Sequence, residues 1–148
     1  MPAAEVTLRQ ATAANSEFAC QVRKATFRGY LEMASGWDEA EQRRLHEKRL
    51  AAQEFRVIQA SGEDVGILAI TRVDDCVRLH QLFILPEHQG KGIGKACMER
   101  VIQEATESGL PVHLQVLKVN GPAQEFYRKL GFQETGQNEW HILMERRP

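Results

Sequence analysis

Three glycines at every second position, Gly90, Gly92 and Gly94, separate an apolar run from an amphipathic stretch. The run at residues 82–85 is typical of a buried strand, and Pro86 ends it. After the glycines, apolar residues recur at helical spacing. Glycine allows a ligand to approach the main chain closely, and the start of a helix offers free N–H groups with a partial positive charge. These residues therefore predict an anion cradle, suited to phosphate, where a strand turns into a helix.

The charges around this loop also favour a phosphate ligand. Lys91 and Lys95 occupy the first turn, and no acidic residue follows before Glu99. Cations are unfavourable at the start of a helix unless an anion binds there, although a plain glycine turn with solvated lysines is the alternative. Two common nucleotide motifs do not fit. A Walker A loop needs four residues between its glycines where residues 90–94 enclose three, and the dinucleotide fingerprint needs G-x-G-x-x-G.

Residues 89–94, Gln-Gly-Lys-Gly-Ile-Gly, resemble the acetyl-CoA pyrophosphate loop of the GCN5-related N-acetyltransferases, Gln/Arg-x-x-Gly-x-Gly/Ala. Residues 120–123 and 126–132 resemble the second signature of that family, and the resemblance covers residues 65–145 well. It implies that acetyl-CoA donates an acetyl group to a primary amine of a small molecule or peptide. A non-catalytic acetyl-CoA-binding sensor or regulatory module is the alternative. The residues expected to hold acetyl-CoA are Leu82, Phe83, Ile84, Gln89, Gly90, Lys91, Gly92, Ile93, Gly94, Lys95, Asn120 and Tyr127.

Two residues are candidates for proton transfer. By the resemblance, Tyr127 protonates the departing thiolate, and a phenol with a pKa near ~10 carries its proton at neutral pH. The alternative is that Tyr127 only packs in the core beside Phe126. Asn120 is expected to bind the cofactor arm, to cap a helix or to do both. His80 is the candidate base, and a period of two places it on one face with Leu82 and Ile84. The alternative for His80 is a surface position, with a chain of waters as the base.

The acceptor amine is expected at residues 27–38, the segment that the family varies for its substrates. Phe27, Tyr30, Met33 and Trp37 offer an apolar and aromatic wall, and Glu32 offers charge for an amine. Asp38 and Glu39 add to the acidic character of the segment and weakly favour a cationic acceptor. Trp37 has a second interpretation as a hydrophobic staple before a helix.

Composition excludes several classes of function. The chain has 148 residues, which fits a single domain at 1–148, and its formal net charge of −1 indicates no nucleic-acid surface. No apolar run approaches a membrane span and residues 1–5 do not form a signal peptide, so a cytoplasmic protein is expected. The three cysteines are widely spaced and predict core thiols, and the histidines lack metal-ligand spacing, so no metal is expected. Pairing of two copies through the last strands is the oligomer that the resemblance suggests.

The chain order predicts an α/β fold with a mixed sheet, β-α-α-β-β-β-α-β-α-β-β. A first helix is expected to end where residues 29–36 break its pattern, and Asp38 is expected to cap a second helix. A strand, a helix and a strand around the glycine loop imply a parallel pair. This order is similar to the acyl-CoA N-acyltransferase fold, in which that parallel pair splays apart and the pantetheine arm enters the gap.

Overall fold

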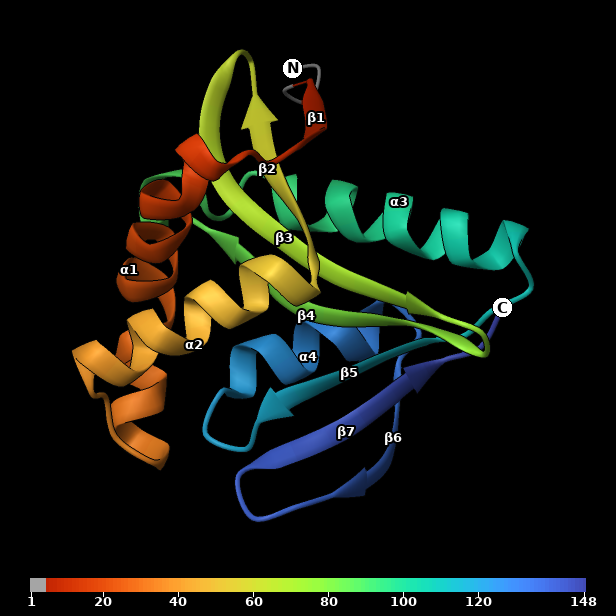
Figure 1. Cartoon of the computed structure of the whole chain (residues 1–148). Helices are drawn as coiled ribbons and strands as arrows, with labels where there is room; N and C mark the ends of the chain where they lie inside the picture. The colour runs from red at the N-terminus through yellow and green to blue at the C-terminus, as the bar shows by residue number, and fades with distance from the viewer. Residues whose placement is uncertain (1–4) are drawn as a thin grey trace.

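One mixed sheet crosses the whole molecule, with its strands in the order β1-β2-β3-β4-β5-β7-β6 (Figure 1). The computed structural model describes residues 5–148, so the expectation that the N-terminus is not a signal peptide falls mostly outside the described residues. The chain order and the mixed sheet predicted from the sequence are confirmed. The strands are β1 (Val6–Gln10), β2 (Glu54–Ala60), β3 (Glu63–Val73), β4 (Cys76–Ile84), β5 (Val112–Leu117), β6 (Gln133–Gln137) and β7 (His141–Arg146).

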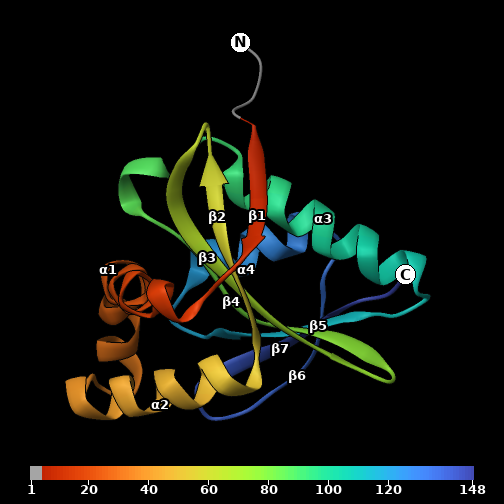
Figure 2. The same cartoon turned by 45° about the horizontal axis from the view of Figure 1, so that its top comes forward.

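Helices cover both faces of the sheet, and each face has its own apolar cluster. α1 (Ser16–Ala34) and α2 (Glu39–Ala52) lie together on one face, whereas α3 (Ile93–Glu107) and α4 (Gly121–Lys129) lie on the other (Figure 2). Successive side chains of β3 belong to different clusters, because Ile67 packs toward α1 and Leu68 packs toward α3. The helix face that carries Cys97, Met98 and Val101 in α3 is fully buried, as the spacing of its apolar residues predicts.

The parallel strands β4 and β5 separate soon after they begin. Their pairing extends only from Val77 opposite Val112 to Leu79 opposite Leu114, and the two strands then diverge toward α1 and α2 (Figure 1). A bulge coincides with the start of this divergence, since Ile70 of β3 pairs with Leu79 and Ala69 pairs with Gln81. Bulges add twist to a strand and redirect its side chains. The predicted splayed pair is therefore present, with a local cause in β4.

The first helix is longer than the sequence pattern predicted. α1 runs through Gly29 to Ala34, and Gly36, whose φ is 96°, follows its C-cap, so the expected break at Gly29 is wrong. A glycine inside a helix costs only about 1 kcal/mol, which burial of the inner face of α1 offsets. The next expectation is confirmed, because the Asp38 carboxylate accepts the N–H of Glu41 at 3.0 Å and caps α2.

A buried histidine holds α2 against α1. His46 is 3% exposed, and its Nε2 lies 3.1 Å from the main-chain oxygen of Ser16, to which it donates. Burial lowers the pKa of His46, so the ring is neutral at pH 7. This contact fixes the position of the highly charged α2, whose sequence offers few apolar anchors.

Candidate functional site

A cavity of about 860 Å³ opens where β4 and β5 diverge. Its lining comes from both faces of the sheet, with α1 and α2 on one side and the start of α3, α4 and β5 on the other. The cavity brings together residues that are far apart in the sequence, from Arg23 to His141. Predicted site residues in its lining are Phe27, Tyr30, His80, Leu82, Phe83, Ile84, Gln89, Gly90, Gly92, Ile93, Gly94, Lys95, Asn120 and Tyr127.

The glycine loop has the conformation that an anion cradle requires. Gly90 and Gly92 have φ values of 76° and 79°, which L side chains rarely adopt, and Gly92 is the N-cap of α3. No side chain caps this helix, and its first turn contains no acidic residue. Gln89 ties the loop to β4, because its Nε2 donates to the main-chain oxygen of Ile84 at 2.8 Å. The free N–H groups at the start of α3 therefore fit a phosphate ligand.

The edge of β4 that faces the gap offers main-chain groups. The N–H of Leu85 donates to the oxygen of Val65 on β3 at 2.8 Å, and successive residues of a strand direct these groups to opposite edges. Leu82 and Ile84 therefore face the gap, whereas the main chain of Phe83 faces β3. The family resemblance implies that the main chain of Phe83 and Ile84 holds pantetheine and polarises the carbonyl. The geometry fits Ile84 and its neighbour Leu82 but not Phe83, whose side chain lies on the α1 side.

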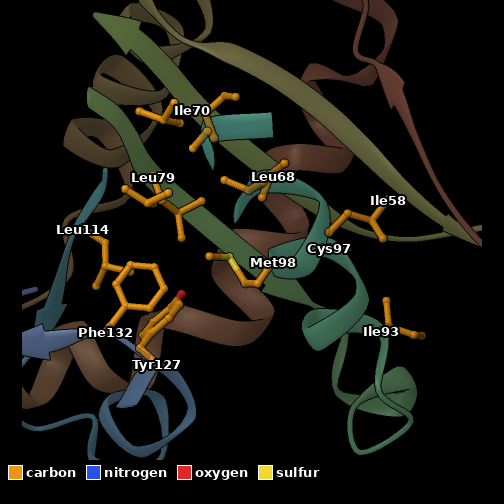
Figure 3. Close-up of a cluster of buried hydrophobic side chains, with 14 of the residues drawn as sticks. Ile58, Leu68, Ile70, Leu79, Ile93, Cys97, Met98, Leu114, Tyr127 and Phe132 are labelled. Atoms are coloured by element: carbon orange, nitrogen blue, oxygen red, sulfur yellow. The ribbon is translucent and has the colours of Figure 1, made fainter. Parts of the chain in front are cut away.

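Tyr127 reaches the cavity from α4. Its side chain is 9% exposed and contacts the rings of Phe126 and Phe132 edge to face, with centroids 5.1 and 5.6 Å away. Figure 3 shows its hydroxyl oxygen directed toward Met98 of α3. Burial raises the pKa of Tyr127 further above its ordinary value, so the phenol holds its proton at neutral pH. The residue is thus both part of the core and exposed to the cavity.

Asn120 caps the helix that carries Tyr127. Its Oδ1 accepts the N–H of Ala123 at 3.2 Å, and Asn120 also lines the cavity. The capping interpretation is therefore confirmed, and the side-chain amide nitrogen is left to meet a ligand. The cofactor role of Asn120 stays a prediction.

His80 occupies the bulge of β4, which interrupts the alternation assumed from the sequence. Leu79, Leu82 and Ile84 all pack toward α3 although they differ in parity, so a period of two does not hold across His80. The Nε2 of His80 lies 2.6 Å from the Thr71 hydroxyl. Desolvation lowers the pKa of His80, so the ring is neutral at pH 7 and can accept a proton.

The predicted acceptor segment divides in two. Phe27 and Tyr30 line the cavity, but Glu32, Met33 and Trp37 do not. Glu32 pairs with Arg28 at 2.6 Å, and Met33 is 67% exposed. Trp37 borders a separate shallow depression and donates from Nε1 to Glu39 at 2.9 Å. The continuation of α1 beyond Gly29 explains part of this division, because Leu31 lines the cavity whereas the adjacent Glu32 and Met33 do not, and Trp37 lies beyond the end of the helix.

Several polar residues of the cavity lining were not found from the sequence, among them Arg23, Arg49 and Gln81. Arg23 lies four residues before Phe27, on the inner face of α1, and an arginine among apolar positions of a helix was the available signal. Gln81 is a polar residue inside an apolar strand run. Because the bulge shifts the alternation of side chains in β4, a period of two does not predict which face of the sheet the Gln81 side chain occupies. Arg49 has no comparable sequence signal, because α2 is charged throughout.

The three cysteines were predicted to be core thiols. Among residues 5–148, this is confirmed for Cys76 and Cys97 but not for Cys20, which is half-buried. No group of three or more potential metal-ligating side chains occurs in this range. Cys76 and Cys97 are buried, and burial raises the pKa of Cys97 to about 11, which keeps the thiol protonated and unreactive. No helix in this part of the chain is long and apolar enough to cross a membrane.

Comparisons with known proteins agree with this geometry. Residues 18–132 match the model of the acetyltransferase (GNAT) family. An uncharacterised N-acetyltransferase of Methanocaldococcus jannaschii is 34% identical over 88 residues, which are 54% of this chain and 39% of that protein. Human N-acetyltransferase 8B is 33% identical over 95 residues, 60% of this chain and 42% of its own length. These matches span about two fifths of the length of these curated relatives.

Solved structures share the fold over nearly the whole chain. The PaiA N-acetyltransferase of Thermoplasma acidophilum, in complex with coenzyme A, superposes with a TM-score of 0.79 at 16% identity, covering 97% of this chain and 99% of that one. An acetyltransferase of Thermus thermophilus superposes with a TM-score of 0.81 at 18% identity, and the match covers 100% of both chains. At such low identity these likenesses establish the fold alone.

Proposed function

Because the chain belongs to the acetyltransferase (GNAT) family, we propose that it transfers the acetyl group of acetyl-CoA to a primary amine. The observation that carries this proposal is the single cavity that joins the glycine loop, the free edge of β4 and the Tyr127 side chain. A binding module needs only the first two of these features. An enzyme also needs a proton donor placed in the same cavity, and Tyr127 supplies one.

The residues of the cofactor half fit acetyl-CoA. The first N–H groups of α3, with Gly90 and Gly92, would hold the pyrophosphate, and Lys95 would add a positive charge at the cavity wall. The main chain of Leu82 and Ile84 would hydrogen-bond the pantetheine arm as another strand would. Acetyl-CoA supplies the activated acyl group as a thioester. Related proteins support this assignment, since the T. acidophilum structure contains coenzyme A and the Arabidopsis thaliana Naa50 structure contains a bisubstrate analogue.

Three tasks remain for the side chains and main chain of this protein. A free N–H at the gap edge of β4 would polarise the carbonyl oxygen of the thioester. His80, or water held near it, would accept the proton that the amine loses on attack. Tyr127 would donate its proton to the sulfur as the C–S bond breaks. Burial keeps Tyr127 protonated across the physiological range, so the proton is present for transfer.

A panel of amines incubated with acetyl-CoA tests the proposal. The expected result is amine-dependent release of free thiol, together with a product heavier by one acetyl group in mass spectrometry. The same panel run with Tyr127→Phe separates catalysis from binding. Tight binding of CoA without turnover of any amine would overturn the proposal and favour a non-catalytic sensor or regulatory module.

A further inference from the structure

The acidic residues of the expected acceptor segment are all engaged elsewhere. Glu32 pairs with Arg28, and the Asp38 carboxylate caps α2. Glu39 accepts from Trp37 and lies 3.4 Å from Lys24. No carboxylate occurs among the described residues that line the cavity. The cationic acceptor that the sequence favoured therefore has no anionic partner in this wall.

The wall contains positive charge in place of the expected acids. Arg23 is 8% exposed, and its guanidinium stacks against Phe27 and Phe83 with 4.8 and 5.8 Å between the guanidinium carbon and each ring centre. Its only hydrogen bond to a described side chain is a long one, 3.4 Å, to the oxygen of Gln42. Arg49 also borders the cavity, and its buried Nη1 has no partner among residues 5–148. A buried guanidinium without an anion is costly, which indicates that a ligand supplies one.

Gln81 is the second independent sign of a ligand. It is 3% exposed, lines the cavity from β4, and both its Nε2 and its Oε1 lack partners among the described residues. A buried amide is normally hydrogen-bonded, so two unpaired atoms on one side chain require an explanation. The amide can donate to an oxyanion and accept from an amine at the same time. Gln81 directly follows the bulge, at the point where the acceptor half meets the cofactor half.

These groups lie apart from the predicted phosphate cradle. Phe83 and the inner face of α1 belong to the apolar cluster on the α1 side, whereas Leu82, Ile84 and the α3 face belong to the opposite cluster. The pyrophosphate of CoA would occupy the start of α3, so it leaves the two arginines without an anion. The missing anion must then come from the acceptor.

We propose that the acceptor is a small amine that carries an oxyanion, with Arg23 and Arg49 binding that oxyanion and Gln81 bridging it to the amine. A free amino acid, with its carboxylate close to its amino group, is the simplest compound of this kind, and an amine phosphate shares the chemistry. The planar guanidinium of Arg23, packed against two aromatic rings, presents its donors in the fork that a carboxylate matches. This inference rests on the proposed acetyltransferase function and adds its substrate class.

Matched acceptor pairs test the inference. Each L-amino acid is compared with its C-terminal amide, O-phosphoethanolamine with ethanolamine, and spermidine serves as the cationic probe. The expected result is that kcat/KM for the best acid exceeds that of its amide by about 10- to 100-fold, the range for a charge-assisted hydrogen bond. The amino-acid and phosphate arms distinguish the two sources of oxyanion. Faster turnover of spermidine or of the amides would overturn the inference while leaving the acetyltransferase function intact.

Variants assign the effect to the wall. In Arg49→Gln, the ratio of kcat/KM between acid and amide should fall by about 10-fold or more, because the lost interaction binds only the acid. Arg44→Gln is the matched control, since it removes the same charge from the exposed face of α2, where Arg44 pairs with Glu41. Arg23→Lys provides a second variant that retains the charge and loses the fork. An unchanged ratio in both cavity variants, each shown to be folded by circular dichroism, would overturn the inference.

Binding measurements separate this inference from the proposed function. Isothermal titration of the CoA-loaded protein with an amino acid and with its amide needs no turnover. Selective binding of the acid without acetyl transfer would contradict the enzyme and support the oxyanion site. Turnover with no preference between acid and amide would support the enzyme and contradict the oxyanion site.

Discussion

The two halves of the cavity use different parts of the polypeptide to provide positive potential. At the start of α3, the potential comes from main-chain N–H groups and from glycines in a left-handed conformation. On the α1 and α2 wall it comes from side chains, chiefly the buried Arg23 and the half-buried Arg49. The first arrangement depends on consecutive residues, whereas the second depends on residues from separate elements that meet only after folding.

Because of this difference, we expect the two halves to respond differently to mutation. Substitutions at Gly90 and Gly92 should disturb the proposed cofactor half, since both glycines have positive φ. The proposed acceptor half should respond to substitution of individual side chains of its wall. The predictions below perturb one half at a time.

Tyr127→Phe is expected to give the largest effect, a fall in kcat of ~10²–10⁴-fold with little change in CoA affinity or melting temperature. The substitution removes only the O–H from a ring that packs against Phe126 and Phe132. Single-turnover kinetics and calorimetric CoA binding measure the two quantities. A kcat within a few-fold of wild type, with chemistry rate-limiting, would show that Tyr127 is only a core residue.

Gly92→Asp should weaken CoA binding by at least about 100-fold, because two unit charges about 4 Å apart near a protein surface interact by about 4 kcal/mol. No protein atom lies within 4 Å of a Cβ added at Gly92, so the loss would not reflect a clash within the protein. Gly109→Asp is the control. Gly109 also has a positive φ, 69°, and open space, but it lies beyond the far end of α3. Equal CoA affinities in the two variants would contradict the anion cradle.

Phe27→Ala should raise the acceptor KM by about 10-fold and leave the acetyl-CoA KM nearly unchanged, since the half-buried Phe27 ring would lose part of the roughly 1.5–3 kcal/mol that a fully buried aromatic side chain contributes. Phe27 holds the guanidinium of Arg23 and lines the cavity. Trp37→Ala is the comparison, because Trp37 lies outside the cavity although the sequence placed it in the acceptor site. A larger rise in the acceptor KM in Trp37→Ala than in Phe27→Ala would instead support an acceptor site at residues 32–37.

The smallest expected effect is at His80. If His80 is the base, it must be neutral to act, and desolvation with repulsion from Arg78 and Arg49 lowers its pKa. The pKa of His80 therefore lies below the ordinary value of 6.5. Activity should be present at pH values above this lowered pKa and be lost as the pH falls through it. His80→Gln should remove that acid limb and lower kcat/KM by about 10-fold, less than the usual range for a general base, because solvent reaches this exposed position. If the acid limb of the pH profile is unchanged in His80→Gln, then water rather than His80 accepts the proton of the amine.

Local sequence was sufficient where the structure depends on neighbouring residues. The strand before the loop, the glycine turn, the helix after it and the Asp38 cap all follow from short-range patterns of apolar spacing and backbone chemistry. The pattern failed at Gly29, because burial of the inner face of α1 outweighs the weak propensity of one glycine. It also failed at His80, because a bulge depends on pairing with β3 and has no signature in β4 alone.

By itself, the sequence predicted the order of elements, the parallel strand pair and the glycine turn before α3, which follow from the periodicity of apolar residues and from conformations that only glycine adopts readily. The anion cradle stays a prediction from that turn, and Tyr127 as the candidate acid came from the family resemblance. Only the tertiary structure decided the charge of the acceptor wall. Residues 23, 49 and 81 come from α1, α2 and β4, and their partners are set by packing across the sheet. The acids of residues 32–39 belong to local ion pairs and a helix cap, so counting charges along the chain predicted the wrong sign for the cavity.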